Sequence, residues 1–220
     1  MKNKSNIFRD YKKVCIIGTG GFAREVLTYV IDIYNEFNMI FENKICFLEK
    51  DEYCKEETIM GFKVIPESNF DPEKYVVIIG VGDPIVRKKI VEKYPTNTEY
   101  CTLIHPTAIV SNWVQIQEGA VICPGVVLTC NINIGKHAHL NLNTTIGHDC
   151  NIGEFFTTAP AVNISGNCEI GDCVYFGTNS AIKQGVNVSN NVTVGMGAVV
   201  TKNIIEPGIY IGNPLKKLIK

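Results

Sequence analysis

The sequence predicts a small α/β domain over residues 1–103, followed by a parallel β-helix over residues 104–220. Before Leu103, short apolar runs alternate with stretches of helical periodicity, which is typical of a parallel sheet covered by helices. After Leu103 no helical period recurs, and aliphatic residues return instead at every sixth position. A chain of 220 residues has room for two such domains.

The first domain is predicted from three apolar runs and two helical segments. Residues 14–17 form an apolar run that ends at Gly18-Thr19-Gly20-Gly21, which indicates a buried strand entering a turn. Residues 45–48 and 76–79 are predicted strands, and residues 84–94 form a predicted helix with proline in its first turn. The spacing of an amphipathic helix recurs at Val26, Leu27, Val30, Ile31 and Tyr34. About 100 residues supply half of the strands of a doubly wound fold, so we expect a half-Rossmann-like domain.

A period of six residues defines the second domain. Counting in sixes from Ile104 to Val200 gives seventeen positions without an insertion, and all except Thr158 and Phe176 are Ile, Val or Leu. The fifth position of each hexad is mostly small or β-branched, and both columns are expected to point inward. The second column contains Ala108, Val114, Ala120, Val126, Ala138, Cys150, Val162, Cys168, Val174, Val192 and Ala198.

Three such hexads make one triangular coil of a parallel β-helix, so each coil takes eighteen residues. The segment from Ile104 to about Ile211 has room for six coils, stacked at roughly the 4.8 Å spacing of neighbouring strands. Glycine is frequent at the second position, a pattern that resembles the hexapeptide signature of left-handed β-helices. These glycines are Gly135, Gly147, Gly153, Gly171, Gly177 and Gly195.

Composition argues against several classes of protein. Hydrophobic residues make up 45% and charged residues 20%, which argues against intrinsic disorder. The net charge of −1 gives no global basic field for nucleic acid or an anionic membrane. Residues 1–13 are polar and no apolar run approaches the roughly 20 residues that span a bilayer, so neither export nor membrane insertion is expected. Nine scattered cysteines without a C-x-x-C pair are interpreted as reduced thiols in a cytoplasmic protein, with a zinc site as the alternative.

Several segments carry a resemblance to a known family. They are VCIIGTGGFAREV at residues 14–26, LIHPTA at 103–108, GHDC at 147–150 and GIYIGNP at 208–214. In these segments the sequence resembles the nucleotide-linked amino-sugar N-acetyltransferases of the bacillosamine and perosamine type. It also resembles their relatives, the sialic acid O-acetyltransferases. The resemblance implies a homotrimer that uses acetyl-CoA. It also implies that the first domain binds the nucleotide sugar, that the β-helix binds CoA, and that the active site lies between neighbouring subunits.

His148 is the candidate general base. Acetyl transfer to an amine requires a base for the proton and donors for the tetrahedral oxyanion. His148 lies at the third position of its hexad, outside both inward columns, which argues against a core histidine. Asp149 could orient the imidazole, with a solvated turn aspartate as the alternative. Gly166 lies one coil further on the same face, and the resemblance implies that its amide faces the acetyl carbonyl, although turn geometry also explains a glycine there.

Further contacts of the β-helix domain follow from the resemblance or from charge. The resemblance implies that Asn141, seven residues before His148, lies near the sugar amine, although an inert turn also explains an asparagine there. Lys183 and Lys202 are candidate contacts for the phosphates of CoA. The inward cysteines at positions 150 and 168 are expected to pack rather than react, so the amine should attack acetyl-CoA directly.

The glycine-rich turn is the candidate phosphate site of the first domain. Gly18, Gly20 and Gly21 offer backbone N–H groups and precede a helix N-terminus. With Ala23 the segment also fits the dinucleotide fingerprint G-x-G-x-x-A. Because the domain is too short for a complete dinucleotide fold, a nucleotide-sugar diphosphate is favoured over NAD.

Three more residues bear on substrate binding in the first domain. Glu49 and Asp51 follow the second strand, where the family usually has an acid that contacts the nucleotide, and the sequence leaves open which of them serves. Phe22 stands where the family often has histidine, a departure that concerns recognition of the sugar.

Other histidines suggest different functions. His137 and His139 flank the inward Ala138, so they are expected to project outward together. With His148 they resemble the zinc ligands of trimeric carbonic anhydrases, although their spacing departs from that pattern, and no metal is expected. His105 precedes a proline at the domain junction and is interpreted as a structural turn residue. O-acetylation of a sialic acid or another sugar hydroxyl, and a noncatalytic binding scaffold, are the remaining alternatives.

Overall fold

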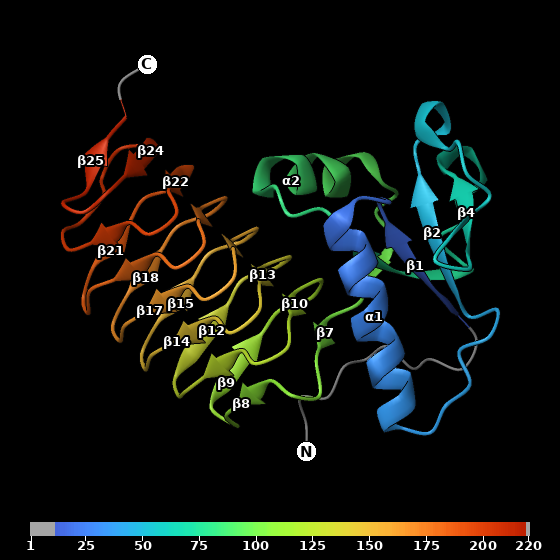
Figure 1. Cartoon of the computed structure of the whole chain (residues 1–220), viewed down its shortest axis with the longest axis horizontal. Helices are drawn as coiled ribbons and strands as arrows, with labels where there is room; N and C mark the ends of the chain where they lie inside the picture. The colour runs from blue at the N-terminus through green and yellow to red at the C-terminus, as the bar shows by residue number, and fades with distance from the viewer. Residues whose placement is uncertain (1–11, 219–220) are drawn as a thin grey trace.

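The computed structural model describes residues 12–218 and contains two domains that lie side by side (Figure 1). The first is a half-Rossmann-like α/β domain, and the second is a left-handed parallel β-helix. The sheet of the first domain has the strand order β3-β4-β2-β1-β5-β6. The N-terminal stretch 1–13, for which no export signal is expected, lies almost entirely outside the described residues.

The first domain contains the strands and helices that its sequence predicts and, in addition, one hairpin, a short strand at its end and two 3₁₀ helices. Its strands are β1 (Lys13–Ile17), β2 (Ile45–Glu49), β3 (Thr58–Ile59), β4 (Phe62–Pro66), β5 (Tyr75–Ile79) and β6 (Glu99–Tyr100). Its helices are α1 (Gly21–Glu36) and α2 (Pro84–Lys93), with short 3₁₀ helices at Asp51–Tyr53 and Glu67–Asn69. Strand β3 pairs antiparallel with β4 through a turn at Met60 and Gly61, which both have positive φ. The remaining strands pair in parallel.

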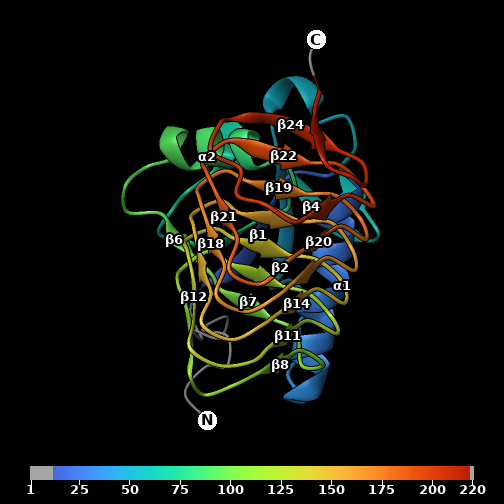
Figure 2. The same cartoon turned by 90° about the vertical axis from the view of Figure 1, so that its left-hand side faces the viewer.

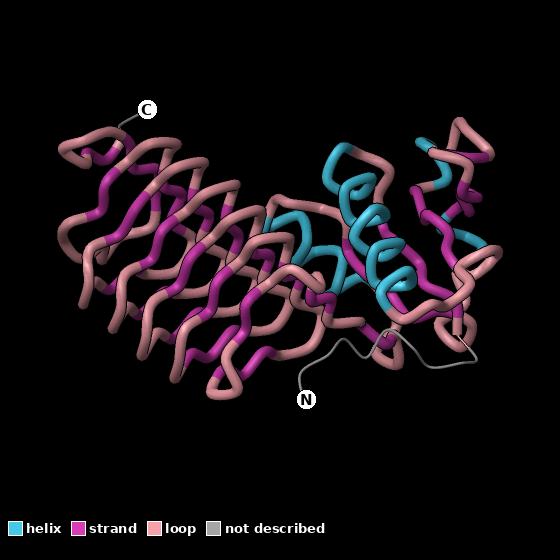
Figure 3. The backbone as a smooth tube through the Cα atoms, turned by 60° about the horizontal axis from the view of Figure 1, so that its bottom comes forward, coloured by secondary structure: helices cyan, strands magenta, loops and turns pink. Residues whose placement is uncertain are grey.

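The two helices cover opposite faces of this sheet. Helix α2 packs on the face formed by Cys15, Leu48 and Ile79. Helix α1 lies between the other face and the β-helix, and its apolar side chains join the two interiors into one hydrophobic cluster. Figures 2 and 3 show α1 and α2 beside the coils from two further directions. The two domains therefore share an extensive contact.

The β-helix has three sheets, which we call I, II and III. Sheet I contains β7 (Leu103–Ile104), β10 (Val121–Ile122), β13 (His139–Leu140), β16 (Thr157–Thr158), β19 (Tyr175–Phe176), β22 (Val192–Val194), β24 (Gly208–Ile211) and the antiparallel β25 (Lys216–Lys217). Sheet II contains β8 (Ile109–Val110), β11 (Val127–Leu128), β14 (Thr145–Ile146), β17 (Asn163–Ile164), β20 (Ala181–Ile182) and β23 (Val199–Val200). Sheet III contains β9 (Val114–Ile116), β12 (Ile132–Ile134), β15 (Asn151–Ile152), β18 (Glu169–Ile170) and β21 (Asn187–Val188).

The register repeats every eighteen residues, as the period predicts. In sheet II, for example, Val127 pairs with Thr145, and Thr145 pairs with Asn163. Both predicted columns are buried along almost the whole stack. A Cβ atom on Gly135 would lie 2.6 Å from the carbonyl carbon of Gly153 in the next coil, so the close stacking of coils requires glycine there.

Each coil turns at three corners, which we name after the sheets that they join. In one coil the III–I corner is residues 135–138, the I–II corner is 141–144 and the II–III corner is 147–150. Between residues 117 and 198 one residue of each corner has positive φ, a conformation that asparagine, aspartate and glycine adopt most readily. Examples are Asn131, Asn143 and Asp149. Corner asparagines therefore have a structural role in this fold.

The chain passes from the first sheet to the first coil between β6 and β7. Between residues 12 and 218, neither helix is long and apolar enough to cross a membrane. All nine cysteines lie within the described residues, and each is a free thiol.

Candidate active site

His148 lies at the II–III corner, two residues after the end of β14, with 49% of its side chain exposed. Its Nδ1 atom is 2.7 Å from a carboxylate oxygen of Asp149. Because a carboxylate only accepts hydrogen bonds, Nδ1 carries the proton and Nε2 is left as the acceptor. The imidazole is therefore oriented with a basic nitrogen available at the surface.

Asp149 is held by a second hydrogen bond. The Asn131 side-chain amide donates to its other oxygen at 3.0 Å. These two hydrogen bonds, the one from His148 first, hold the pKa of Asp149 below its usual value. Asn131 was not singled out in the sequence, although it precedes Asp149 by eighteen residues and the coil period brings the two together.

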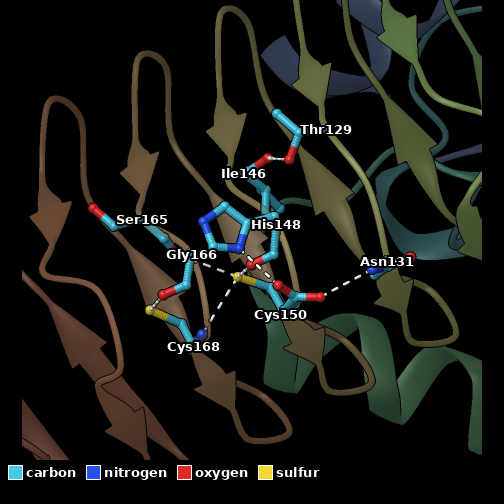
Figure 4. Close-up of polar contacts among 9 residues, drawn as sticks. Thr129, Asn131, Ile146, His148, Cys150, Ser165, Gly166 and Cys168 are labelled. Atoms are coloured by element: carbon cyan, nitrogen blue, oxygen red, sulfur yellow. Dashed lines mark hydrogen bonds and ion pairs between the residues drawn. The ribbon is translucent and has the colours of Figure 1, made fainter.

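The imidazole lies against Gly166 of the next coil (Figure 4). A Cβ atom on Gly166 would lie 2.6 Å from Nε2 of His148, so a larger residue would displace the ring. Gly166 is itself buried. Within residues 12–218 its N–H donates no hydrogen bond. The sequence suggested two reasons for this glycine, an amide that faces the acetyl carbonyl and the geometry of the turn. The structure adds a third, which is space for the imidazole.

Cys150 and Cys168 lie behind this corner, in the interior of the coils (Figure 4). The Cys150 thiol donates to the Ser165 carbonyl at 3.3 Å, and the Cys168 thiol donates to the Lys183 carbonyl at 3.5 Å. Both are buried, as expected for packing residues.

Two lysines continue along the same corner. Lys183 and Lys202 are exposed, and Lys202 follows His148 by fifty-four residues, or three coils. Gln184, also exposed, stands between them at the position equivalent to Gly166. It was missed in the sequence, although counting eighteen residues from Gly166 finds it.

Asn141 lies at a different corner from His148. It follows β13 at the I–II corner, and its side-chain oxygen accepts a hydrogen bond from the Leu142 N–H at 2.7 Å. Within one subunit, strand β14 separates Asn141 from His148. The structure therefore does not bring these two residues together in a single chain.

His137 and His139 do project outward from the coils, but the expectation that this would expose them to solvent is wrong. Both rings point away from the interior of the coils, but the first domain covers them, and they are only 3% and 1% exposed. The His139 ring contacts Phe22, and the His137 ring stacks on Phe155. Docking of the first domain on sheet I buries them, and the hexad pattern gave no indication of this docking. Phe22 is thus a packing partner of the β-helix.

The glycine-rich turn lies at the carboxyl end of β1, beside β5, where the strand order of the sheet reverses direction. In open α/β sheets, ligands bind at this switch point. Helix α1 starts at Gly21 after Gly20, and no side chain caps its first N–H groups. These N–H groups are available to an anion. Gly18, Gly20 and Gly21 therefore form the turn that leads into this helix N-terminus, and their role in phosphate binding stays a prediction.

The two candidate acids of the first domain have different partners. The Glu49 carboxylate accepts a hydrogen bond from the Thr19 hydroxyl at 2.7 Å, which holds it beside the glycine-rich turn. Asp51 accepts hydrogen bonds from the backbone N–H and hydroxyl of Ser68 instead. Of the two, Glu49 is the acid next to the turn.

A cavity of about 310 Å³ opens beside Thr19. Arg24, Tyr53 and Lys55 contribute two cationic groups and an aromatic ring to its lining. The sequence analysis did not single out these three residues. Arg24 directly follows the G-x-G-x-x-A segment and could have been included. Tyr53 ends the short 3₁₀ helix after β2 and Lys55 lies in the loop that follows it, and no periodicity predicts either.

His105 has structural partners. Its Nδ1 contacts the Thr107 hydroxyl at 2.8 Å, and its Nε2 contacts Asp32 of α1 at 3.1 Å. The ring therefore ties the first coil to α1, in agreement with its interpretation as a structural residue. Among residues 12–218, no group of three or more His, Cys, Asp or Glu side chains is arranged to hold a metal ion.

Comparisons with known proteins agree with both domains. Residues 13–94 match the family model of the PglD N-terminal domain, and residues 168–202 match the hexapeptide repeat of succinyl-transferase. A GDP-perosamine N-acetyltransferase from Escherichia coli O157:H7 is 27% identical over 175 residues, which cover 78% of this chain and 78% of that protein.

Two solved structures have the same two-domain fold. The acetyltransferase domain of PglB from Neisseria gonorrhoeae FA1090, in complex with acetyl coenzyme A, is 27% identical with a TM-score of 0.83 and covers 94% of this chain and 99% of that one. WeeI from Acinetobacter baumannii AYE is 29% identical with a TM-score of 0.86 and covers 94% of this chain and 100% of that one. The predicted fold and the resemblance to sugar N-acetyltransferases are confirmed.

Proposed function

We propose that this homologue of sugar N-acetyltransferases transfers the acetyl group of acetyl-CoA to the amine of a nucleotide-linked amino sugar. Residues 1–103 would bind the nucleotide sugar, and residues 104–220 would bind acetyl-CoA and perform the transfer. The observation that carries the proposal is the contact of His148 with both Asp149 and Gly166 at an exposed corner. The reaction involves neither nucleic acid nor a membrane, and we assign it to the cytoplasm.

The chemistry follows from the orientation of His148. The amine nitrogen attacks the thioester carbonyl while Nε2 takes the proton that nitrogen loses. Asp149 keeps Nδ1 protonated and stabilises the imidazolium that forms. The Gly166 N–H is the proposed donor to the tetrahedral oxyanion. Collapse of the intermediate then breaks the C–S bond, and the imidazolium returns its proton to the CoA thiolate.

The spacing along the II–III corner suits acetyl-CoA. Lys202 is three coils beyond His148, roughly 14 Å at about 4.8 Å per coil. This separation is comparable to that between the thioester and the phosphates of an extended CoA. Lys183 stands two coils beyond His148, next to Gln184. We therefore assign the pantetheine arm to this corner and the CoA phosphates to the two lysines.

The first domain supplies features that suit a nucleoside diphosphate. The uncapped N-terminus of α1 and the glycine-rich turn would bind phosphate oxygens. Glu49 would accept from a ribose or base hydrogen-bond donor, and Tyr53 would stack on the base in the neighbouring cavity. Arg24 and Lys55 add positive charge at the same place.

A homotrimer would complete the site. Asn141 and His148 lie at two different corners of one subunit, so one acceptor amine could meet both only where corners of two subunits adjoin. Apolar side chains of the first coil support such an interface, because Ile109 is 65% and Trp113 is 72% exposed in the single chain.

The test is thiol release from acetyl-CoA with a panel of UDP-, dTDP- and GDP-linked amino sugars and free sialic acid. We expect turnover with a nucleotide amino sugar and a fall of at least 100-fold for His148→Ala, whose circular dichroism should match wild type. Turnover with sialic acid alone would establish O-acetylation instead. Unchanged turnover in the variant would refute the assignment of the base.

A further inference from the structure

Arg87 of α2 is a charged residue that the proposed reaction does not use, yet it is fully buried between the two domains. Burial lowers the pKa of Arg87 to about 9, so the guanidinium keeps its charge at neutral pH. Within residues 12–218 its hydrogen-bond partners are all neutral oxygen atoms. A buried cation with so many oriented acceptors indicates a specific role in holding the segments that surround it.

One side of the guanidinium binds two successive coils of the β-helix. Nε donates to the His137 carbonyl at 2.8 Å, and Nη2 donates to the Phe155 carbonyl at 2.9 Å and to the Thr157 hydroxyl at 2.7 Å. His137 and Phe155 occupy the same position of the III–I corner, one coil apart, and both have positive φ. The corner thus turns two carbonyl groups toward a single planar donor.

The other side binds the loop that follows β5. Nη1 donates to the carbonyls of Val81 and Gly82 at 2.8 and 3.1 Å. The Thr157 hydroxyl, which accepts from Arg87, donates in turn to the Gly82 carbonyl at 3.0 Å. The loop at residues 80–82 is therefore tied to the β-helix by Arg87 and by Thr157.

The same loop packs against the glycine-rich turn. The Gly80 N–H donates to the Ile17 carbonyl at 2.8 Å, immediately before that turn. A Cβ atom on Gly80 would lie 2.6 Å from the Ala23 Cβ atom in the first turn of α1. A displacement of the loop would therefore be transmitted to the proposed phosphate site.

We propose that Arg87 is a positioning residue that fixes loop 80–82, and through it the glycine-rich turn, relative to the β-helix. The catalytic consequence rests on the proposed function, because the turn holds the acceptor substrate only if the chain binds a nucleotide sugar. A planar guanidinium can bind both coils and the loop at once, whereas the ammonium of lysine is a single point. Charge alone should therefore not restore the function.

Arg87→Lys is the decisive variant, with Lys88→Met as the control, since Lys88 is an exposed cation on the same helix. We expect the KM for the nucleotide sugar to rise at least tenfold in Arg87→Lys, while the KM for acetyl-CoA, which binds the β-helix alone, stays within twofold. Lys88→Met should match wild type in both. An equal rise in both KM values, or no rise, would overturn the proposal.

A second variant and a second measurement test the proposal if Arg87→Lys folds poorly. Thr157→Val keeps the guanidinium but removes the hydroxyl between it and Gly82, and we expect a three- to tenfold rise in the same KM. Hydrogen exchange in residues 80–82 and 18–23 should accelerate in either variant. This readout needs no turnover, so it decides the proposal even if no amino sugar is a substrate. Exchange equal to wild type would refute the positioning role.

Discussion

Two corners of the β-helix carry histidines, and the same backbone puts them in opposite environments. At the II–III corner His148 is 49% exposed, and its Nδ1 is bound to a carboxylate. Next to the III–I corner His139 is 1% exposed, and neither of its ring nitrogens has a hydrogen-bond partner among the described residues. Both side chains point away from the interior of the coils, and what lies against each of them decides whether the histidine can react or only pack.

The largest effect should follow from closing the space beside His148. In Gly166→Ala the new methyl group would lie 2.6 Å from Nε2, so the ring must move away from its present position. We expect a loss of at least 100-fold in kcat with a KM for the nucleotide sugar near wild type. Steady-state thiol release measures both. Activity within threefold of wild type would contradict the assigned geometry of the base.

The buried histidines should make the fold sensitive to acid. Burial lowers the pKa of His137 to about 4 and that of His139 well below 6.5. The unfolded chain therefore takes up protons between pH 6.5 and about 4 that the folded chain does not. The free energy of unfolding therefore has its full value, as far as these two histidines are concerned, above pH 6.5. It falls as the pH drops below 6.5, by up to about 1.4 kcal/mol per pH unit for each histidine.

Urea unfolding between pH 7.5 and 4.5 tests this expectation. His139→Leu removes one titrating group from an apolar site, so the free energy of unfolding should fall less steeply with decreasing pH than in wild type. A slope that is the same in His139→Leu and in wild type would show that burial of His139 has no such effect.

A smaller effect is expected from the carboxylate of the exposed corner. Asp149→Asn keeps a side chain that tolerates positive φ but removes the charge beside the imidazole. We expect kcat to fall about tenfold, because the imidazolium loses its stabilising partner. Asn131→Gly, which also tolerates positive φ and removes one hydrogen bond to Asp149, should cost less. Equal effects of the two variants would argue that the pair acts by packing alone.

The β-helix was predictable from the sequence because each six-residue repeat forms one side of a coil. The six-residue period fixes which residues point inward, and the eighteen-residue coil puts Gly166 beside His148. The same arithmetic would have found Asn131 and Gln184. Contacts between the domains have no such period. The burial of His137 and the role of Arg87 depend on docking of α1 and α2, which no local pattern encodes.

The first domain was predictable to a lesser degree for a related reason. Its buried strands are continuous apolar runs and are recognised as such, whereas the β3–β4 hairpin is short and half-exposed. The choice between Glu49 and Asp51 depends on side-chain partners that are distant in the sequence, Thr19 for one and Ser68 for the other. Sequence spacing contains no information about such partners.

The constant coil height has a consequence for the size of the donor. Gly166 and Lys202 are two coils apart, roughly 10 Å at about 4.8 Å per coil. Insertion or deletion of a number of residues that is not a multiple of six would turn the apolar columns outward, and a single hexad would move the later residues to a different corner. The separation along one corner can therefore change only in whole coils. If this corner binds CoA as proposed, the distance between the thioester and the CoA phosphates can therefore change only in steps of one coil height. Deletion of one coil between these residues would select for a carrier about 4.8 Å shorter.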